Sequence, residues 1–343
     1  MNSRGDRITE GILVGCCNPM LDLTANVEKS FLDKYGLKPN DAILAGPEHQ
    51  NLAAEVSSSF AVHYSAGGSG LNVMRAAQFG LPEKSVLYIG CIGTDENGRI
   101  IREKVAEEGL LENFQVCPNL PSATCCVLLT ENHRSLVANL AAARNLTAEH
   151  FESSKMAQIF AAARYFYCTG FLLTVCAEAA VKMGRISTET QKTFCFNLSA
   201  PFVCEHYRGQ MLAILPFVDV LFGNESEAEA FAKTNGISYS NVEDIVVALG
   251  TFGLDSNDGT KHRTVIITQG AKPTIALYNG KISHHPVAPI DPALVIDTNG
   301  AGDSFCGGFL SQWILGKSLE QCIDYGNNLA GRIIQTSGIS FRK

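Results

Sequence analysis

The sequence has no run of lysine and arginine, and several other familiar patterns are also missing from it. Its 27 basic residues are outnumbered by 34 acidic ones, which gives a net charge of −7. Nucleic acids and anionic membranes attract basic surfaces, so neither is expected as a partner. No apolar stretch is long enough to cross a bilayer. No CxxC pair is present either, which argues against a zinc site.

The twelve cysteines do not indicate disulfides. The amino-terminal segment lacks the basic end and apolar core of a secretory signal. Cys16 adjoins Cys17 and Cys125 adjoins Cys126, and neighbours in sequence rarely bridge. Cys168 lies in an apolar run, where a buried free thiol is common. These features predict a reducing, cytoplasmic setting.

Short apolar runs alternate with segments of helical spacing along most of the 343 residues. The runs are GILVG (11–15), VLYIG (86–90), YFYC (165–168), FCFNL (194–198), VDVLFG (218–223) and TVIITQG (264–270). Each is bounded by glycine or polar residues, as buried strands are. The alternation predicts a parallel sheet with helices on both faces. Ligands of such sheets bind at the carboxyl ends of the strands.

Two segments interrupt this alternation. Residues 18–66 contain three prolines and many turn residues. Residues 123–139 have the pattern of two strands around a polar turn, a β-hairpin. We expect the two insertions to pair into a small sheet that covers the ligand site, although both could instead be surface decorations. Residues 1–8 and the polar stretch 255–262 are expected to lack regular structure.

The segment DTNGAGDSF (297–305) carries the clearest chemical pattern. Gly300, Ala301 and Gly302 are expected to form a turn, and Asp303 to open a helix. The N–H groups at a helix start lack intrahelical partners and carry the positive end of the helix dipole, and glycines let an anion approach them. The loop could therefore hold a phosphate while Asp303 takes a proton from an attacking hydroxyl. On this segment alone, a helix cap explains Asp303 equally well.

Two further segments suit phosphate chemistry, although the GxxxxGK[ST] motif is absent. In AGGSG (66–70), Ser69 is a candidate helix N-cap before a helical run that carries Asn72; a tight turn before a helix explains the glycines as well. In GNESE (223–227), Asn224 and Glu227 are one helical turn apart. Their oxygens suit Mg²⁺ held mostly through waters and phosphates, and helix capping is the alternative.

In this order, the motifs resemble those of the ribokinase-like carbohydrate and nucleoside kinases. That family has a glycine pair in its first third, an N-x-x-E metal motif and a late D-T-x-G-A-G-D. These match Gly67-Gly68, Asn224 to Glu227, and Asp297 to Asp303, and GCIGTDENG (90–98) is similar to the family's G-x-D-x-x-G element. The resemblance spans about residues 11 to 341. It implies a three-layer α/β/α domain with a mostly parallel central sheet, plus a small α/β lid domain.

Within the family, the chain is most similar to the adenosine kinase branch. The segments that carry this likeness are CNPMLD (17–22), FLDKYGLKPNDAILA (31–45), SAGGSGLN (65–72), NHRSLVANLAAA (132–143), GFLLTV (170–175), FNLSAPF (196–202) and DTNGAGDSFCGGFLSQ (297–312). The likeness implies a monomer that uses ATP and Mg²⁺ to phosphorylate the 5′-hydroxyl of adenosine, giving AMP and ADP in purine salvage. The alternatives are a kinase of another purine nucleoside or of a sugar, and a nucleoside-binding sensor without catalysis.

The same resemblance implies a role for individual residues. The ribose side would be formed by Asn18, Asp22, Gly67, Gly68, Ser69, Asn72 and Asn299. The adenine would be enclosed by Leu44, Leu136, Ala138 and Phe171. The ATP side would be lined by Asn224, Thr268 and Gly270, with Mg²⁺ held through water by Asn224 and Glu227. Asp303 would be the base, and the N–H groups of residues 300–303 would form the anion hole. Arg134 would reach the transferring phosphoryl group, although by itself it reads as a solvated hairpin charge.

The domain boundaries implied are a large catalytic domain of residues 1–17, 67–122 and 140–343, and a lid of residues 18–66 and 123–139. We expect the lid to close on adenosine and to exclude water from the reaction. Ala42 stands where Gln is common in the branch, and Leu172 where a second Phe is common. Both are expected near the base, so the preference among purine nucleosides stays open at this point.

Overall fold

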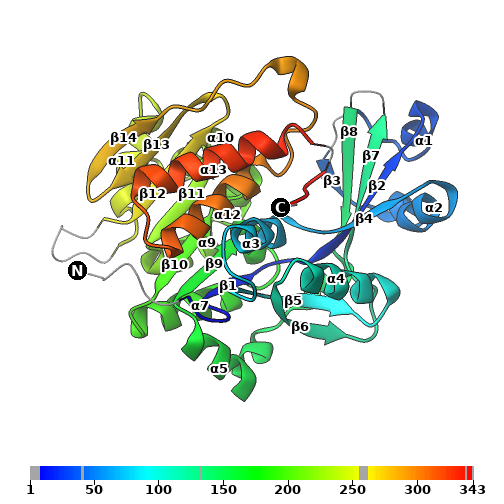
Figure 1. Ribbon diagram of the computed structural model, residues 1–343, viewed down its shortest axis with the longest axis horizontal. Helices are drawn as coiled ribbons and strands as arrows, with labels where there is room; N and C mark the ends of the chain where they lie inside the picture. The colour runs from blue at the N-terminus through cyan, green and yellow to red at the C-terminus, as the bar shows by residue number, and fades with distance from the viewer. Residues whose placement is uncertain (1–7, 40–41, 131–132, 255–261, 337, 342–343) are drawn as a thin grey trace.

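Two β-sheets organise the chain (Figure 1). The computed structural model describes residues 8–39, 42–130, 133–254, 262–336 and 338–341. The two segments predicted to lack regular structure, residues 1–8 and 255–262, lie outside this range except for Ile8 and His262.

The larger sheet has nine strands in the order β14-β13-β12-β11-β10-β9-β1-β5-β6. Their bounds are β1 Leu13–Cys16, β5 Val86–Gly93, β6 Leu111–Cys117, β9 Tyr165–Thr169, β10 Thr193–Asn197, β11 Val220–Asn224, β12 Thr264–Gln269, β13 Lys272–Tyr278 and β14 Lys281–His285. All neighbours pair in parallel except β12–β13 and β13–β14, which are antiparallel. Each of the six predicted runs overlaps one of these strands. The sequence reading missed β6, β13 and β14.

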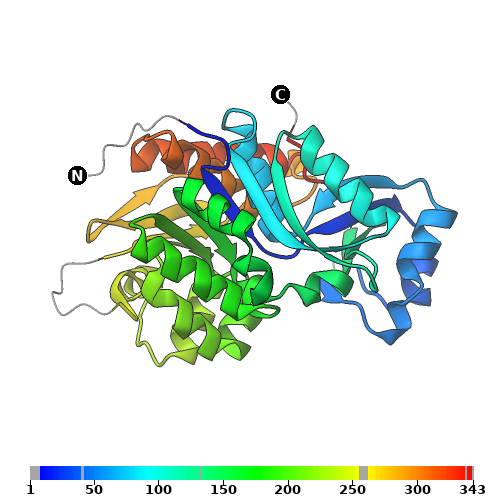
Figure 2. The same ribbon diagram turned by 90° about the horizontal axis from the view of Figure 1, so that it is seen from below.

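Helices cover both faces of this sheet and make three layers (Figure 2). One face carries α3 Ser69–Phe79, α12 Ala301–Ile314 and α13 Leu319–Ile333, and α4 Glu96–Glu107 packs near the β5–β6 edge. The other face carries α5 Ser154–Ala162, α6 Gly170–Leu173, α7 Ala177–Glu189, α8 Pro201–His206, α9 Arg208–Ile214, α10 Glu225–Thr234 and α11 Val242–Thr251.

Close packing of α12 against α3 determines the position of the amino-terminal end of α12. A Cβ added at Gly307 would come 2.3 Å from the carbonyl oxygen of Val73, and one at Gly308 would come 3.1 Å from the Cα of Gly326 in α13. Glycine is therefore required for α12 to fit between its two neighbours. This packing brings the first turn of α12 against the first turn of α3.

The smaller sheet has five strands in the order β3-β8-β7-β2-β4. Its elements are β2 Met20–Asn26, α1 Lys29–Lys34, β3 Ala42–Leu44, α2 Leu52–Ser59, β4 His63–Gly67, β7 Thr124–Thr130 and β8 His133–Asn139. β7 and β8 form the predicted antiparallel hairpin, and β7 pairs in parallel with β2. The prediction that the two insertions pair into one sheet is confirmed, so they are not separate surface decorations. The boundaries proposed for a lid domain stay a prediction.

The structure shows the state of the cysteines and whether any described helix could span a membrane. All twelve cysteines carry free thiols, and ten of them are buried. Across the described residues, we find no helix that combines the length and apolar character needed to span a bilayer.

Candidate active site

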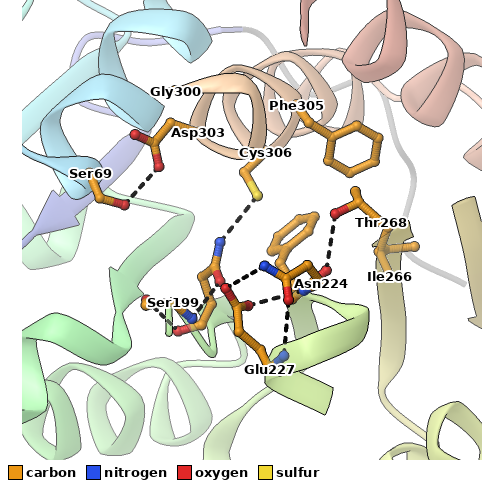
Figure 3. Close-up of a pocket in the computed structure, with 14 residues that line it drawn as sticks. Ser69, Ser199, Asn224, Glu227, Ile266, Thr268, Gly300, Asp303, Phe305 and Cys306 are labelled. Carbon is orange, nitrogen blue, oxygen red and sulfur yellow. Dashed lines mark hydrogen bonds between the residues drawn. The ribbon is translucent and has the colours of Figure 1, made fainter. Parts of the chain in front are cut away.

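A pocket opens at the carboxyl ends of β10, β11 and β12, against the first turn of α12 (Figure 3). It is lined by Ser69, Asn197, Ser199, Phe222, Gly223, Asn224, Glu227, Ile266, Thr268, Gly300, Gly302, Asp303, Phe305 and Cys306. This is the edge at which ligands of parallel sheets are expected. Three of the predicted motifs, from the first, middle and last thirds of the chain, meet here.

Asp303 lies in the first turn of α12 and is held by two donors from α3. The hydroxyl of Ser69 donates to its Oδ1 at 2.7 Å, and the Nδ2 of Asn72 donates to its Oδ2 at 3.1 Å. Two details of the sequence reading are wrong. The helix begins at Ala301, not at Asp303, with Gly300 as its N-cap. Gly68, not Ser69, is the N-cap of α3; Ser69 is the first residue of the helix, and its hydroxyl donates to Asp303.

Burial raises the pKa of Asp303 to about 6, although the hydrogen bonds from Ser69 and Asn72 act in the opposite direction. Removal from water disfavours the charged carboxylate, and donors stabilise it. The result is a group that is ionised near neutral pH and is more basic than an exposed aspartate. Such a carboxylate is suited to accept a proton from a hydroxyl.

The loop before Asp303 presents backbone donors to the pocket. Gly300 has φ +74°, the left-handed conformation that glycine adopts most readily. The N–H of Ala301 donates to the carbonyl of Thr298 at 3.3 Å. The N–H groups of Gly302 and Asp303 lie in the first helical turn, where no preceding carbonyl is in position to accept from them. The anion-binding capacity of the loop therefore rests on these two groups more than on Ala301.

The glycine pair between β4 and α3 allows two polar groups to approach closely. A Cβ at Gly67 would come 2.2 Å from the carboxylate of Asp22, and a Cβ at Gly68, whose φ is +91°, would come 2.3 Å from the carbonyl oxygen of Asn18. Asn18 is buried, and its Oδ1 has no hydrogen-bond partner among the described residues. Burial raises the pKa of Asp22 to about 6, against the lowering effect of the Arg75 and Arg134 charges. The result is a compact polar cluster beside α3, whose four residues lie outside the pocket lining.

Three of the four predicted apolar positions, Leu44, Leu136 and Ala138, share one face of the smaller sheet. Asp22 pairs with Cys125, Cys125 with Ala138, and Ala138 with Leu44, so one row of side chains crosses four strands on one face. Leu136 is two residues from Ala138 on β8, so its side chain also points to this face.

The positions expected near the base do not all lie together. Phe171 is half-buried on α6, where its ring packs against that of Phe202 at 6.1 Å. Leu172 is fully buried in the hydrophobic core, and its place near the base stays a prediction. Ala42 is exposed on β3 and pairs with Leu136, so of the two departures only Ala42 adjoins the open face.

Arg134 joins the smaller sheet to the glycine loop. It lies on β8, and its guanidinium forms an ion pair with the carboxylate of Asp297. Asp297 also accepts hydrogen bonds from the backbone N–H and the Nδ2 of Asn299, at 3.0 and 2.9 Å. Asp297 therefore shapes the turn and holds Arg134 beside it. Arg134 is an ion-paired residue that is largely buried, not a solvated hairpin charge.

Asn224 and Glu227 form a capping box at the start of α10, next to the pocket. The Oδ1 of Asn224 accepts from the Glu227 N–H at 2.9 Å, and the Glu227 carboxylate accepts from the Asn224 N–H at 3.0 Å and from its Nδ2 at 2.8 Å. Burial raises the pKa of Glu227 to about 7. Thr268 lies beside Asn224 on β12, and Gly270 follows in the β12–β13 turn, outside the pocket lining.

Sequence reasoning did not single out three residues that line the pocket, Asn197, Ser199 and Cys306. Asn197 ends β10, and its Nδ2 donates to the Cys306 sulfur at 3.3 Å. Ser199 has φ +75°, and its hydroxyl accepts from the Gly170 N–H at 2.8 Å. The available signal was the presence of two polar residues, Asn197 and Ser199, at the carboxyl end of a buried strand.

A sequence profile of the pfkB family of carbohydrate kinases matches residues 29–342. The chain belongs to the pfkB family. The resemblance to ribokinase-like kinases is thereby confirmed, together with the three-layer α/β/α fold and its smaller α/β part.

Adenosine kinases are among the relatives of this pfkB-family kinase. Adenosine kinase 1 of Arabidopsis thaliana is 38% identical over 97% of this chain and 96% of its own length. The crystal structure of Anopheles gambiae adenosine kinase, in complex with P1,P4-di(adenosine-5) tetraphosphate, is 39% identical, covers 97% of this chain and 98% of that one, and has a TM-score of 0.87. For Schistosoma mansoni adenosine kinase in complex with adenosine, the values are 32%, 97%, 98% and 0.88.

Proposed function

We propose that this pfkB-family kinase is an adenosine kinase, which transfers the γ-phosphoryl group of ATP to the 5′-hydroxyl of adenosine and releases AMP and ADP. The observation that carries the proposal is the Asp303 carboxylate, half-buried beside backbone donors of a glycine loop and held by Ser69 and Asn72. Phosphoryl transfer needs a positioned hydroxyl, a base and charge stabilisation around phosphorus. The relatives described above support adenosine as the acceptor.

The nucleoside would lie between the larger sheet and the open face of the smaller one. Asn18 and Asp22 bind the ribose hydroxyls, with Gly67 and Gly68 leaving room for the sugar and Asn72, Ser69 and Asn299 beside it. The adenine packs on Leu44, Leu136, Ala138 and Phe171. The row that joins Asp22 to Leu44 across four strands supports this arrangement, because a polar sugar and an apolar base need adjacent surfaces of opposite character.

The ATP phosphates would enter from the β11–β12 side. Thr268 and Gly270 line this side, and Asn224 and Glu227 hold Mg²⁺ through water and phosphate oxygens. A buried carboxylate with an adjacent amide fits this ion, which usually takes only one or two protein carboxylates. Mg²⁺ supplies neutralisation of the phosphate charge. Within the described residues, no group of three His, Cys, Asp or Glu side chains forms a closed metal cage.

The chemical step would use Asp303 as the base for the 5′-hydroxyl proton. The N–H groups of Gly302 and Asp303, with those of Gly300 and Ala301 nearby, stabilise negative charge on the transferring phosphoryl group. Arg134 adds a positive charge that Asp297 holds near the loop. Because Arg134 lies on β8, closure of the smaller sheet completes the site.

Further parts of the proposal concern domains, setting and assembly. Residues 18–66 and 123–139 act as a lid on a catalytic domain of residues 1–17, 67–122 and 140–343. The common sheet of the two insertions supports this division. The free thiols of all twelve cysteines support a cytoplasmic location. A monomer without nucleic-acid or membrane partners is proposed from family likeness and from the net charge of −7.

The test compares adenosine, inosine, guanosine and ribose as acceptors, with ATP and Mg²⁺, in the wild type and in Asp303→Ala. Asp244→Ala is a matched control, because Asp244 occupies the same third position of helix α11 and lies outside the pocket lining. We expect the highest kcat/KM for adenosine and a loss of about 10²–10⁴-fold in kcat only in Asp303→Ala. A preference for ribose would contradict the proposed substrate. More than about a tenth of wild-type kcat in Asp303→Ala would exclude it as the base.

A further inference from the structure

Arg75 is a buried arginine in α3 and lies outside the pocket lining. Each N–H donor of its guanidinium nevertheless has a hydrogen-bond acceptor. Its Nε and Nη2 bind the two carboxylate oxygens of Glu108 at 2.6 Å each. Its Nη1 donates to the Ala66 carbonyl at 2.6 Å and to the Asn72 Oδ1 at 3.2 Å. Its Nη2 also donates to the Ile339 carbonyl at 3.2 Å.

Arg75 makes more hydrogen bonds than are needed to neutralise its buried charge. The bidentate pair with Glu108 supplies the counter-charge by itself. The remaining three donors go to the end of β4, to α3 and to the carboxy-terminal chain, which lies beside α3 in Figure 1. Two of these three acceptors adjoin groups of the candidate active site.

The first such acceptor is the amide of Asn72. Ser69, Asn72 and Arg75 are spaced by three residues and therefore lie along one face of α3. Arginine can only donate hydrogen bonds, so the oxygen of the Asn72 amide has to face Arg75. The Nδ2 group is then the one directed to the Oδ2 of Asp303, at 3.1 Å. The reversed amide would place two donors against each other and an oxygen against a carboxylate.

The second acceptor is the carbonyl of Ile339. A Cβ added at Gly300 would come 2.2 Å from the Cδ1 of Ile339, so this side chain packs directly on the N-cap of α12. The ring of Phe341 lies 5.6 Å from the Arg75 guanidinium and 6.1 Å from the ring of Phe79. The Arg75 guanidinium thus contacts both Asn72, which donates to Asp303, and the carboxy-terminal segment, which packs on Gly300.

We propose that Arg75 is a positioning residue for the transfer reaction, which orients the Asn72 amide toward Asp303 and holds the Ile339 chain against the glycine loop. The inference rests on the proposed function, because it assumes that Asp303 acts as a base. Loss of the Asn72 donor leaves Asp303 with Ser69 alone, which makes the carboxylate more basic and less well directed. The acid limb of the rate profile then moves to higher pH.

Other groups near Asp303 have to be separated from this effect. Those that interact electrostatically with it are Cys17, Asp22, Tyr88, Tyr167, Glu227 and Cys306. The charge of Arg75 also lowers the pKa of Asp22. Arg75→Lys retains the positive charge but loses the planar fork, so it tests orientation without removing the charge. Arg75→Met removes both.

The experiment measures kcat and KM against pH for the wild type, Arg75→Lys, Arg75→Met and a control, Arg263→Met. Arg263 is a second buried arginine, and it donates to the carbonyls of Leu215 and Leu249. In both Arg75 variants we expect an acid limb about one pH unit higher and a kcat about tenfold lower, with KM for ATP little changed. The control is expected to lose stability without a shift of the limb.

An unshifted limb in Arg75→Lys, or a shift in Arg263→Met equal to that of Arg75→Met, would overturn the inference. If Arg75→Lys does not fold, Glu108→Gln replaces it, since this change loosens the fork and leaves Arg75 in place. A crystal structure of the variant supplies a readout independent of activity, the Asn72 Nδ2 to Asp303 Oδ2 distance. A wild type that does not phosphorylate adenosine would refute the proposed function, whereas an active wild type with unshifted variants would refute only the role of Arg75.

Discussion

Replacement of Asp303 by Asn is expected to make the protein more stable at neutral pH while it removes activity. The carboxylate is half-buried, and its partial removal from water raises its pKa from 3.8 to about 6. Between these pH values the folded protein retains a proton that the unfolded chain has released. The free energy of unfolding therefore falls as pH rises through this window, and the full cost is present above about pH 6.

The size of this cost follows from the two pKa values. At about 1.4 kcal/mol for each pH unit, the interval from 3.8 to about 6 corresponds to about 3 kcal/mol. Asparagine removes the charge and keeps the shape. Its oxygen can accept from Asn72, and its amide can donate to Ser69, whose hydroxyl then accepts. For 343 residues and about 2.1 cal/mol/K of unfolding entropy per residue, the gain equals a Tm rise of about 4 °C.

The assay is thermal unfolding of the wild type and Asp303→Asn at pH 8 and at pH 4, in the absence of ligands. We expect the variant to be more stable at pH 8 and the difference to vanish near pH 4, where the wild-type carboxyl is protonated. Asp244→Asn is the control, because Asp244 is an exposed carboxylate at the same helix position. A variant that is equally stable or less stable at pH 8 would refute the argument that burial of this charge is costly.

Three further predictions follow from the site. Ser69→Ala removes the 2.7 Å donor to Asp303, so the acid limb of kcat/KM should move up by about one pH unit; an unmoved limb would show that this hydrogen bond does not stabilise the charged base. Gly67→Ala places a Cβ 2.2 Å from the Asp22 carboxylate, and we expect KM for adenosine to rise about tenfold with a smaller change in kcat. An unchanged KM would show that Asp22 does not bind adenosine. Arg134→Met and Asp297→Asn should be non-additive in their effect on kcat, with a coupling of about 0.5–3 kcal/mol in a double-mutant cycle, and additive effects would mean that their ion pair does not support the reaction.

Local patterns were sufficient for six of the nine strands of the larger sheet and for the hairpin of the smaller sheet. The runs VLYIG and TVIITQG became β5 and β12 because a buried strand needs only apolar residues between two breakers. The antiparallel strands β13 and β14 were missed. β13 follows β12 across a short turn at Gly270, and no strand was predicted after that turn.

Errors at the two helix starts have one physical cause. Ser69 was expected to cap α3, and Asp303 was expected to open α12. Each helix instead begins after a glycine with positive φ, and the two side chains bind each other. A local rule could not have found this partner, because Ser69 and Asp303 are 234 positions apart in the chain.

The sequence by itself determined the family, the alternation of strands and helices, and the residue types of the site. Glycines, acids and amides are placed at the ends of apolar runs, and those positions are readable without a structure. Only the tertiary structure decided which of these side chains meet. The contact between α3 and α12, which requires glycine at 307, brings Ser69, Asn72 and Asp303 together. The pKa of Asp303 and the role inferred for Arg75 both arise from that burial, which no single segment encodes.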